Sequence, residues 1–239
     1  MKTTIRKAED RGFANHGWLQ ANHSFSFANY YNPENMQFGA LRVLNDDIIA
    51  PSMGFGTHPH DNMEIITIPF SGVLKHRDSM ANEWLEVKPN EVQVMSAGTG
   101  LQHSEINGSA KDYLSLFQIW IMPKERSVKP RYDQKTFSAE ARKNKLQVLV
   151  ESMDSDNPES LKIHQDAQIS RIDLSEGESF QYNLNNPSNG VYVMTISGKH
   201  IINDSELNSR DAMEISETDS FTTMAKEDSE LLFIEVPMT

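Results

Sequence analysis

The feature that most constrains the fold is the repeated alternation of short apolar segments with turn-forming residues. The segments are rich in Val, Ile, Phe and Trp, and clusters of Asn, Asp, Gly, Pro and Ser separate them. β-branched and aromatic residues favour strands, whereas the separating residues favour turns. No helical period of useful length interrupts this pattern in the first 122 residues. Many short strands at this spacing are typical of a sandwich or barrel, so we expect an all-β fold.

The first half of the chain contains six segments that we expect to form strands. The turn signals between them include Asn45-Asp46-Asp47, Ser71-Gly72 and Gly98-Thr99-Gly100. The last of the six alternates poorly, which predicts a strand buried on both faces. The expected strands cover residues 39–44, 63–70, 72–76, 83–87, 92–95 and 113–121.

The second half repeats this layout after a polar connection from Pro123 to about Asp166, in which we expect one short strand at 146–150. The segment 190–198 resembles 63–72, because each is an apolar strand that ends in Ser-Gly. The pattern therefore predicts two similar β-sandwiches. The expected strands of the second half cover residues 168–174, 178–182, 190–196, 199–202 and 230–236.

Composition excludes several classes of site. The chain has 239 residues and no cysteine, which rules out disulfides, thiolate nucleophiles and cysteine-ligated zinc or iron–sulfur centres. Any catalytic metal must then be held by His, Asp or Glu. No apolar run approaches the roughly 18 residues that span a bilayer, and the start lacks the apolar core of a signal peptide. We expect a cytoplasmic protein that makes no contact with a membrane.

The net charge of −12 is distributed unevenly. Residues 1–150 carry 17 Lys and Arg against 16 Asp and Glu, whereas residues 151–239 carry 5 against 18. An acidic surface repels phosphate backbones, so direct binding of nucleic acid is disfavoured. A solvated acidic face is the simpler interpretation of the C-terminal half, although a protein partner remains an open alternative.

Two glycine-rich blocks, residues 54–64 and 98–107, together predict one metal site. A lone His-x-His pair is more often two solvated histidines on a strand edge, but the second block repeats the same spacing. Residues two apart on a strand share a face, so each block directs two ligand-type side chains to one side. Imidazole and carboxylate at this ratio suit a divalent metal with open positions, which favours catalysis over a structural role. The ligand-type residues are His58, His60, His103 and Glu105.

The same residues resemble a known family. The two blocks are similar to the two cupin motifs, and more narrowly to those of pirins, with the start of the chain similar to bacterial pirin-like proteins assigned as quercetin 2,3-dioxygenases. The resemblance covers the first 132 residues, and beyond them it is one of layout and length. Its motifs are His58-Pro-His60, His76-Arg77-Asp78-Ser79, Met95–Gly100, His103-Ser104-Glu105, Arg11–Trp18 and His23–Tyr31.

The resemblance implies a bicupin, with a metal-binding jelly-roll domain over residues 1–132 and a cupin-like domain without metal ligands over residues 133–239. It implies one divalent ion, foremost Fe(II), with Mn, Ni, Cu, Co or Zn as alternatives. The implied ligands are His58, His60, His103 and Glu105. In general cupins the motif glutamate, here Glu64, is the fourth ligand; pirins use the position of Glu105, so Glu64 is expected to orient an imidazole.

The activity implied is that of a metal-dependent dioxygenase that opens the heterocyclic ring of flavonols such as quercetin with O₂ and releases carbon monoxide. Glu105 would act as the catalytic base. Trp18, Phe25 and Phe27 either line an aromatic pocket or pack in the core, whereas His16, His23 and the His76–Ser79 turn are expected to be structural. The alternative is a non-catalytic, metal-binding regulatory protein that acts through a protein partner.

Overall fold

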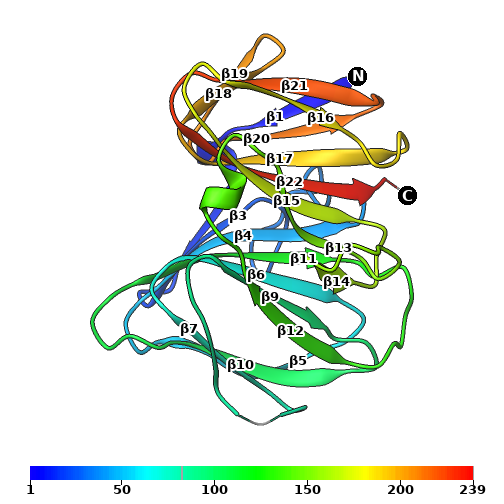
Figure 1. The fold of residues 1–239 in the computed structure, drawn as a ribbon. Coiled ribbons are helices and arrows are strands. Elements are labelled where there is room, and N and C mark those ends of the chain that lie inside the picture. Colours follow the sequence, from blue (N-terminus) through cyan, green and yellow to red (C-terminus); the bar gives the residue numbers. More distant parts are fainter. Residues whose placement is uncertain (82, 239) are drawn as a thin grey trace.

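The computed structural model describes residues 1–81 and 83–238, which form four stacked β-sheets (Figure 1). In the first half, a seven-stranded sheet has the order β12-β9-β6-β11-β4-β3-β2, and a four-stranded sheet has the order β5-β10-β7-β8. The strands of this half are β2 (Gly12–Asn15), β3 (Leu19–His23), β4 (Leu41–Ile49), β5 (Gly54–His60), β6 (Glu64–Ser71), β7 (Leu74–Asp78), β8 (Leu85–Val87), β9 (Glu91–Ser96), β10 (Leu101–Asn107), β11 (Leu114–Ile121) and β12 (Arg131–Thr136).

The second half repeats this arrangement with a seven-stranded sheet, β1-β20-β17-β22-β15-β13-β14, and a four-stranded sheet, β16-β21-β18-β19. Two 3₁₀ helices are η1 (Ala8–Asp10) and η2 (Glu140–Arg142). The strands are β1 (Lys2–Arg6), β13 (Gln147–Ser152), β14 (Leu161–Ile163), β15 (Gln168–Leu174), β16 (Ser179–Asn183), β17 (Asn189–Ser197), β18 (Lys199–Ile202), β19 (Ser205–Asn208), β20 (Ala212–Ser216), β21 (Ser220–Ala225) and β22 (Ser229–Pro237).

The internal repeat is the reason for the matching strand orders. Strands β6 and β17 occupy equivalent central places, and each ends in the predicted Ser-Gly turn. Gly72 and Gly198 adopt positive φ angles of 78° and 84°, a conformation that glycine adopts without steric cost. The predicted all-β fold of two jelly-roll sandwiches is confirmed.

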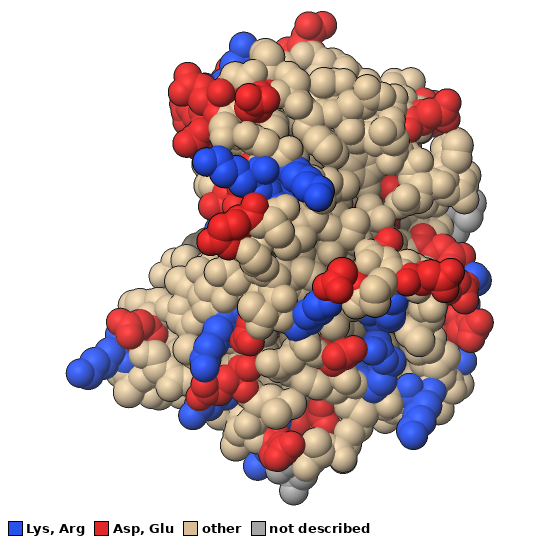
Figure 2. Space-filling model, viewed as in Figure 1, with Lys and Arg blue, Asp and Glu red and all other residues tan. Residues whose placement is uncertain are grey.

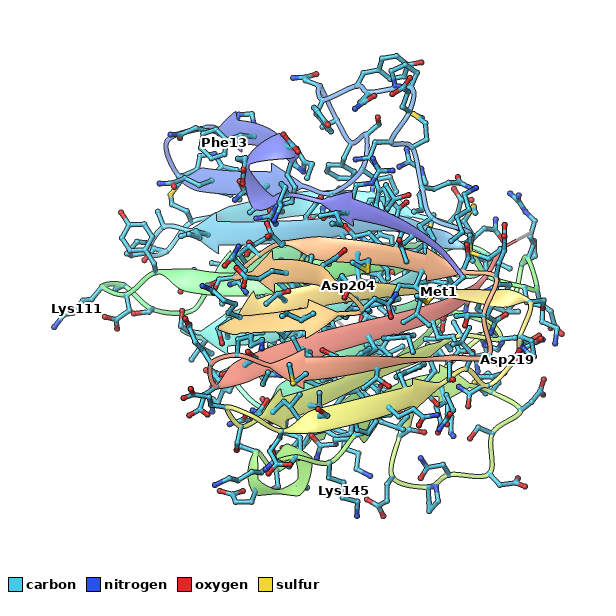
Figure 3. The ribbon with its side chains drawn as sticks, turned by 90° about the horizontal axis from the view of Figure 1, so that it is seen from above. Met1, Phe13, Lys111, Lys145, Asp204 and Asp219 are labelled. Carbon is cyan, nitrogen blue, oxygen red and sulfur yellow. The ribbon has the colours of Figure 1, made fainter. Side chains whose placement is uncertain are left out.

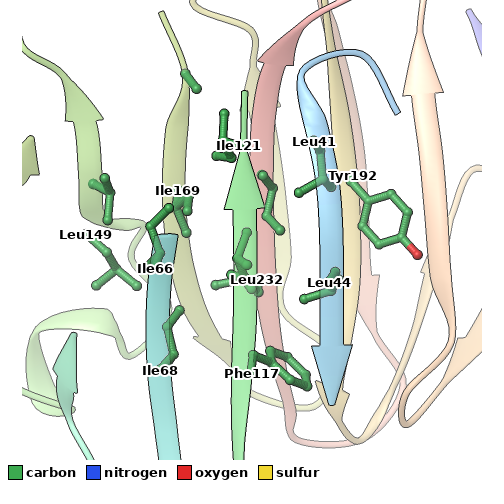
Figure 4. Packing of buried hydrophobic residues seen from close by; sticks show 14 of the residues in the cluster. Leu41, Leu44, Ile66, Ile68, Phe117, Ile121, Leu149, Ile169, Tyr192 and Leu232 are labelled. Atoms are coloured by element: carbon green, nitrogen blue, oxygen red, sulfur yellow. The ribbon is translucent and has the colours of Figure 1, made fainter. Parts of the chain in front are cut away.

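The two large sheets face each other, and the main core lies between them (Figure 4). Leu44 and Phe117 of the first half belong to the same buried cluster as Tyr192 and Leu232 of the second. Strand β11, which supplies Phe117, is buried along most of its length on both faces, as its sequence predicts. Both sandwiches therefore stabilise each other through one shared apolar layer.

A second core fills the interior of the C-terminal sandwich. The rings of Tyr182, Phe221 and Phe233 stack there, with centroids 4.9 Å apart for Tyr182–Phe233 and 5.4 Å apart for Tyr182–Phe221. These residues come from strands β16, β21 and β22. Strands β16 and β21 hold the places that β5 and β10 hold in the first half, so aromatic side chains stand where the first half carries histidine.

Strand pairing crosses the expected domain division. Strand β1 pairs with β20 of the second half, and Figure 3 shows it running beside strands of that half from Met1. Strand β12 pairs with β9 and extends the first large sheet as far as Thr136. The division between residues 132 and 133 stays a prediction. The two pairings show that β1 belongs to a sheet of the second half and that β12 belongs to a sheet of the first.

Two expectations about local structure are wrong. Asn45-Asp46-Asp47 is not a turn but the middle of β4, which continues to Ile49. The segment 123–166 holds three strands, β12, β13 and β14, where one was expected. In both cases polar side chains hide a strand, because pairing with neighbouring strands outweighs local propensity.

The basic residues are concentrated on the first half of the molecule, as their distribution in the sequence predicts. In the view of Figure 2, most Lys and Arg atoms lie over the lower half and at the waist between the halves. Across residues 1–81 and 83–238, no helix is long and apolar enough to cross a membrane. The cytoplasmic location stays a prediction.

Candidate metal centre

The two ligand blocks form adjacent antiparallel strands, β5 and β10, of one sheet. His103 lies directly opposite His58, and the register shifts between His103 and Glu105, where Glu105 pairs with Phe55. This β-bulge places one more residue on β5 than on β10, so Phe55 and His58 both face the interior. Bulges of this kind are common beside active sites, where they redirect side chains. The blocks are neighbours in one sheet and not on facing strands.

Three imidazoles meet at this point. Ligand nitrogens of His58, His60 and His103 all lie within 4.8 Å of one another. The Nε2 atoms of His58 and His103 are 2.9 Å apart. Two nitrogens about 2.1 Å from one ion, at a right angle to each other, are about 3 Å apart, so this spacing suits adjacent ligands of a metal. The cluster can hold a metal ion.

The orientation and charge of the imidazoles also suit a metal. The His58 Nδ1 atom lies 2.8 Å from the carbonyl oxygen of Gly56, so an Nδ1–H donates to that oxygen and leaves the lone pair on Nε2. Burial lowers the pKa of His60 to about 4, with His58 adding to the effect. Burial and the neighbouring histidines lower the pKa of His103 to about 2. Neutral imidazole is the form that binds metals.

Glu105 lies in the wall of the same cavity and is 2% exposed. Its Oε2 accepts a hydrogen bond of 2.9 Å from Gln118 Nε2, while its Oε1 is buried without a partner. Burial raises the pKa of Glu105 to about 7. The group within 4.8 Å consists of the three histidines, so the role of Glu105 as fourth ligand stays a prediction.

Glu64 does not orient a site imidazole, contrary to the sequence expectation. Its Oε2 accepts a 2.6 Å hydrogen bond from Ser96 Oγ. It shares a face of β6 with Ile66 and Ile68, which belong to the core between the halves. Strand β5 ends at His60 and a new strand begins at Glu64, so the two side chains need not share a face.

A cavity of about 430 Å³ opens above the histidines. Its apolar walls include Trp18 and Phe27, as expected, together with Phe55 and Trp120. Phe25, the third aromatic residue expected there, lies in the central core instead. An adjoining hollow of about 490 Å³ shares six of these lining residues and continues outward to Phe13, His16 and Tyr30. His23 is buried and bonded to Asn45, so it is a packed histidine that also borders the cavity.

Three polar residues that line the cavity were not predicted as site residues: Asn45, Asp47 and Gln118. Asn45 pairs across the sheet with both His23 and Gln118, which forms a polar row on the cavity face. Burial raises the pKa of Asp47 to about 8, with Asp46 and Glu105 adding to the effect. The signal that could have found them is their position: polar residues interrupt an otherwise apolar strand.

His76 lies behind the metal cluster. Its ring is fully buried, lies 5.3 Å from that of His103 and stacks on Tyr132 with centroids 5.0 Å apart. Burial lowers the pKa of His76 to about 4, so it is neutral beside Asp78, 4.0 Å away, and no charged pair forms at neutral pH. Asp78 caps the following turn by accepting the Met80 N–H at 2.7 Å. The motif is structural, as expected, but His76–Asp78 belong to strand β7 and not to a turn.

Comparison with known proteins places this geometry in a family. The sequence model of the family Pirin matches residues 4–121, and that of the quercetinase C-terminal cupin domain matches residues 149–236. A protein named quercetin 2,3-dioxygenase from Escherichia coli (strain K12) is 44% identical over 233 residues, which cover 98% of each chain. The chain belongs to the pirin family. The pirin resemblance stated from the motifs is thereby confirmed.

Other pirins agree with this assignment. A pirin-like protein from Caulobacter vibrioides is 42% identical over 231 residues, which cover 96% of this chain and 98% of the relative. The crystal structure of the bacterial pirin YhhW in complex with nickel(II), from Escherichia coli, superimposes with a TM-score of 0.93 at 40% identity and covers both chains completely. That relative holds nickel, and the histidine cluster of this pirin could also bind a metal ion.

Proposed function

We propose that this pirin is a metal-dependent dioxygenase that opens the heterocyclic ring of flavonols such as quercetin with O₂ and releases carbon monoxide. The observation that carries the proposal is a cluster of three imidazoles at the base of a cavity with aromatic walls. Such a cavity suits a planar apolar ligand, and open ligand positions suit catalysis. The relatives named quercetin 2,3-dioxygenase support the same activity.

The donor set fits the metal that this activity needs. His58, His60 and His103 would hold the ion, and Glu105 is proposed as the fourth ligand because its Oε1 is buried without a partner. Nitrogen and carboxylate donors suit Fe(II), the ion proposed first, and also Mn, Ni, Co, Cu or Zn as alternatives. A bound divalent ion supplies Lewis-acid chemistry that makes a substrate hydroxyl more acidic.

The protein's own side chains would bind the substrate and move one proton. Trp18, Phe27 and Trp120 would exclude water from the face of a planar ring. Glu105 would take the proton of the hydroxyl, while Gln118 donates a hydrogen bond to its Oε2. With the hydroxyl deprotonated, the ring becomes electron-rich, which is the form that reacts with O₂.

Incubation of the metal-loaded protein with quercetin, with and without O₂, tests the proposal. We expect flavonol absorbance to fall only with O₂ and one equivalent of carbon monoxide to appear. Apo-protein prepared with a chelator is the control, and it should leave the flavonol unchanged. Metal-loaded protein that binds quercetin yet leaves it intact in air would favour the non-catalytic regulatory alternative.

A further inference from the structure

The side chain of Asp47 borders the cavity, and its carboxyl has no role in the proposed reaction. It lies in the middle of β4, is 3% exposed, and its Oδ1 is buried without a hydrogen-bond partner. A buried polar atom left unpaired destabilises the folded state. The strand tolerates this cost, which points to a partner that arrives with a ligand.

The neighbours of Asp47 on β4, unlike Asp47 itself, have partners for their polar side chains. Asp46 faces the other way and pairs with Arg11 at 3.3 Å and Arg210 at 3.1 Å. Asn45, on the cavity face, is satisfied by His23 at 2.9 Å. Asp47 lies between Ala21 and Leu116 on the adjacent strands, and neither side chain can donate a hydrogen bond. The residues directly opposite Asp47 on the two adjacent strands therefore leave it without a side-chain partner.

The position of Asp47 relative to the metal cluster identifies what it faces. It borders the same cavity as His58, His60 and Glu105, and the remaining walls are largely apolar. A ligand held at the histidines therefore presents another part of its surface to β4. Only a polar group on that part of the ligand can pair with Asp47.

We infer that Asp47 is a specificity-determining residue that binds a second hydroxyl group of the substrate. The inference rests on the proposed function and narrows its substrate class to aromatic compounds with at least two separated hydroxyl groups. A hydroxyl suits the site because it both donates and accepts hydrogen bonds. Sites that hydrogen-bond a substrate hydroxyl strongly reject analogues that lack it.

The test compares quercetin with 3-hydroxyflavone, which keeps the hydroxyl expected at the metal and lacks the others. Binding is measured by anaerobic titration of metal-loaded and metal-free protein, so it does not depend on turnover. We expect wild-type protein to bind quercetin at least about 10-fold more tightly than 3-hydroxyflavone. Asp47→Leu should remove most of this preference by weakening quercetin alone, and Asp47→Asn, which still forms hydrogen bonds, should keep much of it.

A second measurement separates recognition from misfolding. Asp47→Leu removes an unpaired buried carboxyl, so the ligand-free variant should unfold at the same or a higher temperature than wild type. An unchanged ratio of the two affinities in Asp47→Leu, equal weakening of both ligands, or no quercetin binding by wild type would overturn the inference. Quercetin binding with the expected preference but no O₂-dependent loss would instead refute the dioxygenase proposal and leave this inference standing.

Discussion

At the scale of single residues, the candidate metal centre depends on which side chains point into the cavity. His58 and His60 lie two residues apart on β5 and point to the same face, with ring centroids 4.9 Å apart. Their spacing in the sequence was therefore sufficient to predict their common direction. Glu64 shows the limit of that reasoning, because a turn between His60 and Glu64 resets the alternation.

Replacement of His58 by Ala should remove most bound metal and leave the fold intact, because one of three imidazoles is lost from a partly exposed position. Metal content after dialysis and circular dichroism would measure both effects. The matched control is the pair His164→Ala and His200→Ala, which lies in the second half. Loss of metal in this control would contradict the assignment of the site to the first half.

Glu105→Gln should retain part of the metal and lose on the order of 10² to 10⁴ in rate, because an amide can coordinate weakly but cannot accept the proton. The comparison is Glu64→Gln, whose carboxylate bonds Ser96 outside the cavity. This variant should keep its metal and turn over nearly as wild type does. Metal content and O₂-dependent quercetin loss at saturating metal would distinguish them. Loss of metal in Glu64→Gln with normal turnover in Glu105→Gln would return the ligand role to Glu64.

At the scale of elements, strand β4 shows what a sequence can and cannot reveal. Its apolar start, Leu41–Leu44, was predicted, whereas its polar middle was taken for a turn. Asn, Asp and Gly favour turns in isolation, but Asp46 is held by two arginines from distant parts of the chain. Long-range pairs of this kind are invisible to local propensity. The metal motif was predictable because its chemistry is local to two strands.

Strand β5 gives a prediction about glycine. A Cβ atom on Gly54 would lie 2.1 Å from the carbonyl oxygen of Glu105, whereas one on Gly56 would meet nothing within 4 Å. Gly54→Ala should therefore push β5 away from β10, cost about 1–3 kcal/mol of stability and weaken metal binding. Gly56→Ala should change neither property. Thermal unfolding and metal titration of both variants would check this, and equal behaviour of the two would disprove the close-approach argument.

At the scale of the whole molecule, the second sandwich keeps the architecture and replaces the site with a core. Its only deeply buried histidine among the described residues of that half is His200, which hydrogen-bonds Thr195 at 2.9 Å and Thr223 at 2.7 Å. The sequence predicted that this half lacks paired histidines. It did not predict that stacked aromatic rings would fill the interior, because that depends on the strand register.

Burial lowers the pKa of His200 to about 4, which predicts a pH dependence of stability. The unfolded chain binds a proton near pH 6.5 and the folded chain does not, so stability is present above that pH and falls as pH drops toward 4. The loss should be on the order of 2 kcal/mol between pH 7 and 5. His200→Gln, which cannot titrate, should lose less over this range in denaturant unfolding of metal-free protein. Identical pH profiles would contradict the prediction.

The pairing of β1 with β20 has a consequence for the order in which the chain is built. The ribosome makes Lys2–Arg6 long before their partner, Ala212–Ser216. Lys2–Arg6 must therefore stay without this partner while the residues between the two strands are made. Their docking also ties Arg6 to Glu214 and Lys7 to Asp211. Strand β1 can thus pair with β20 only after most of the second sandwich has been synthesised.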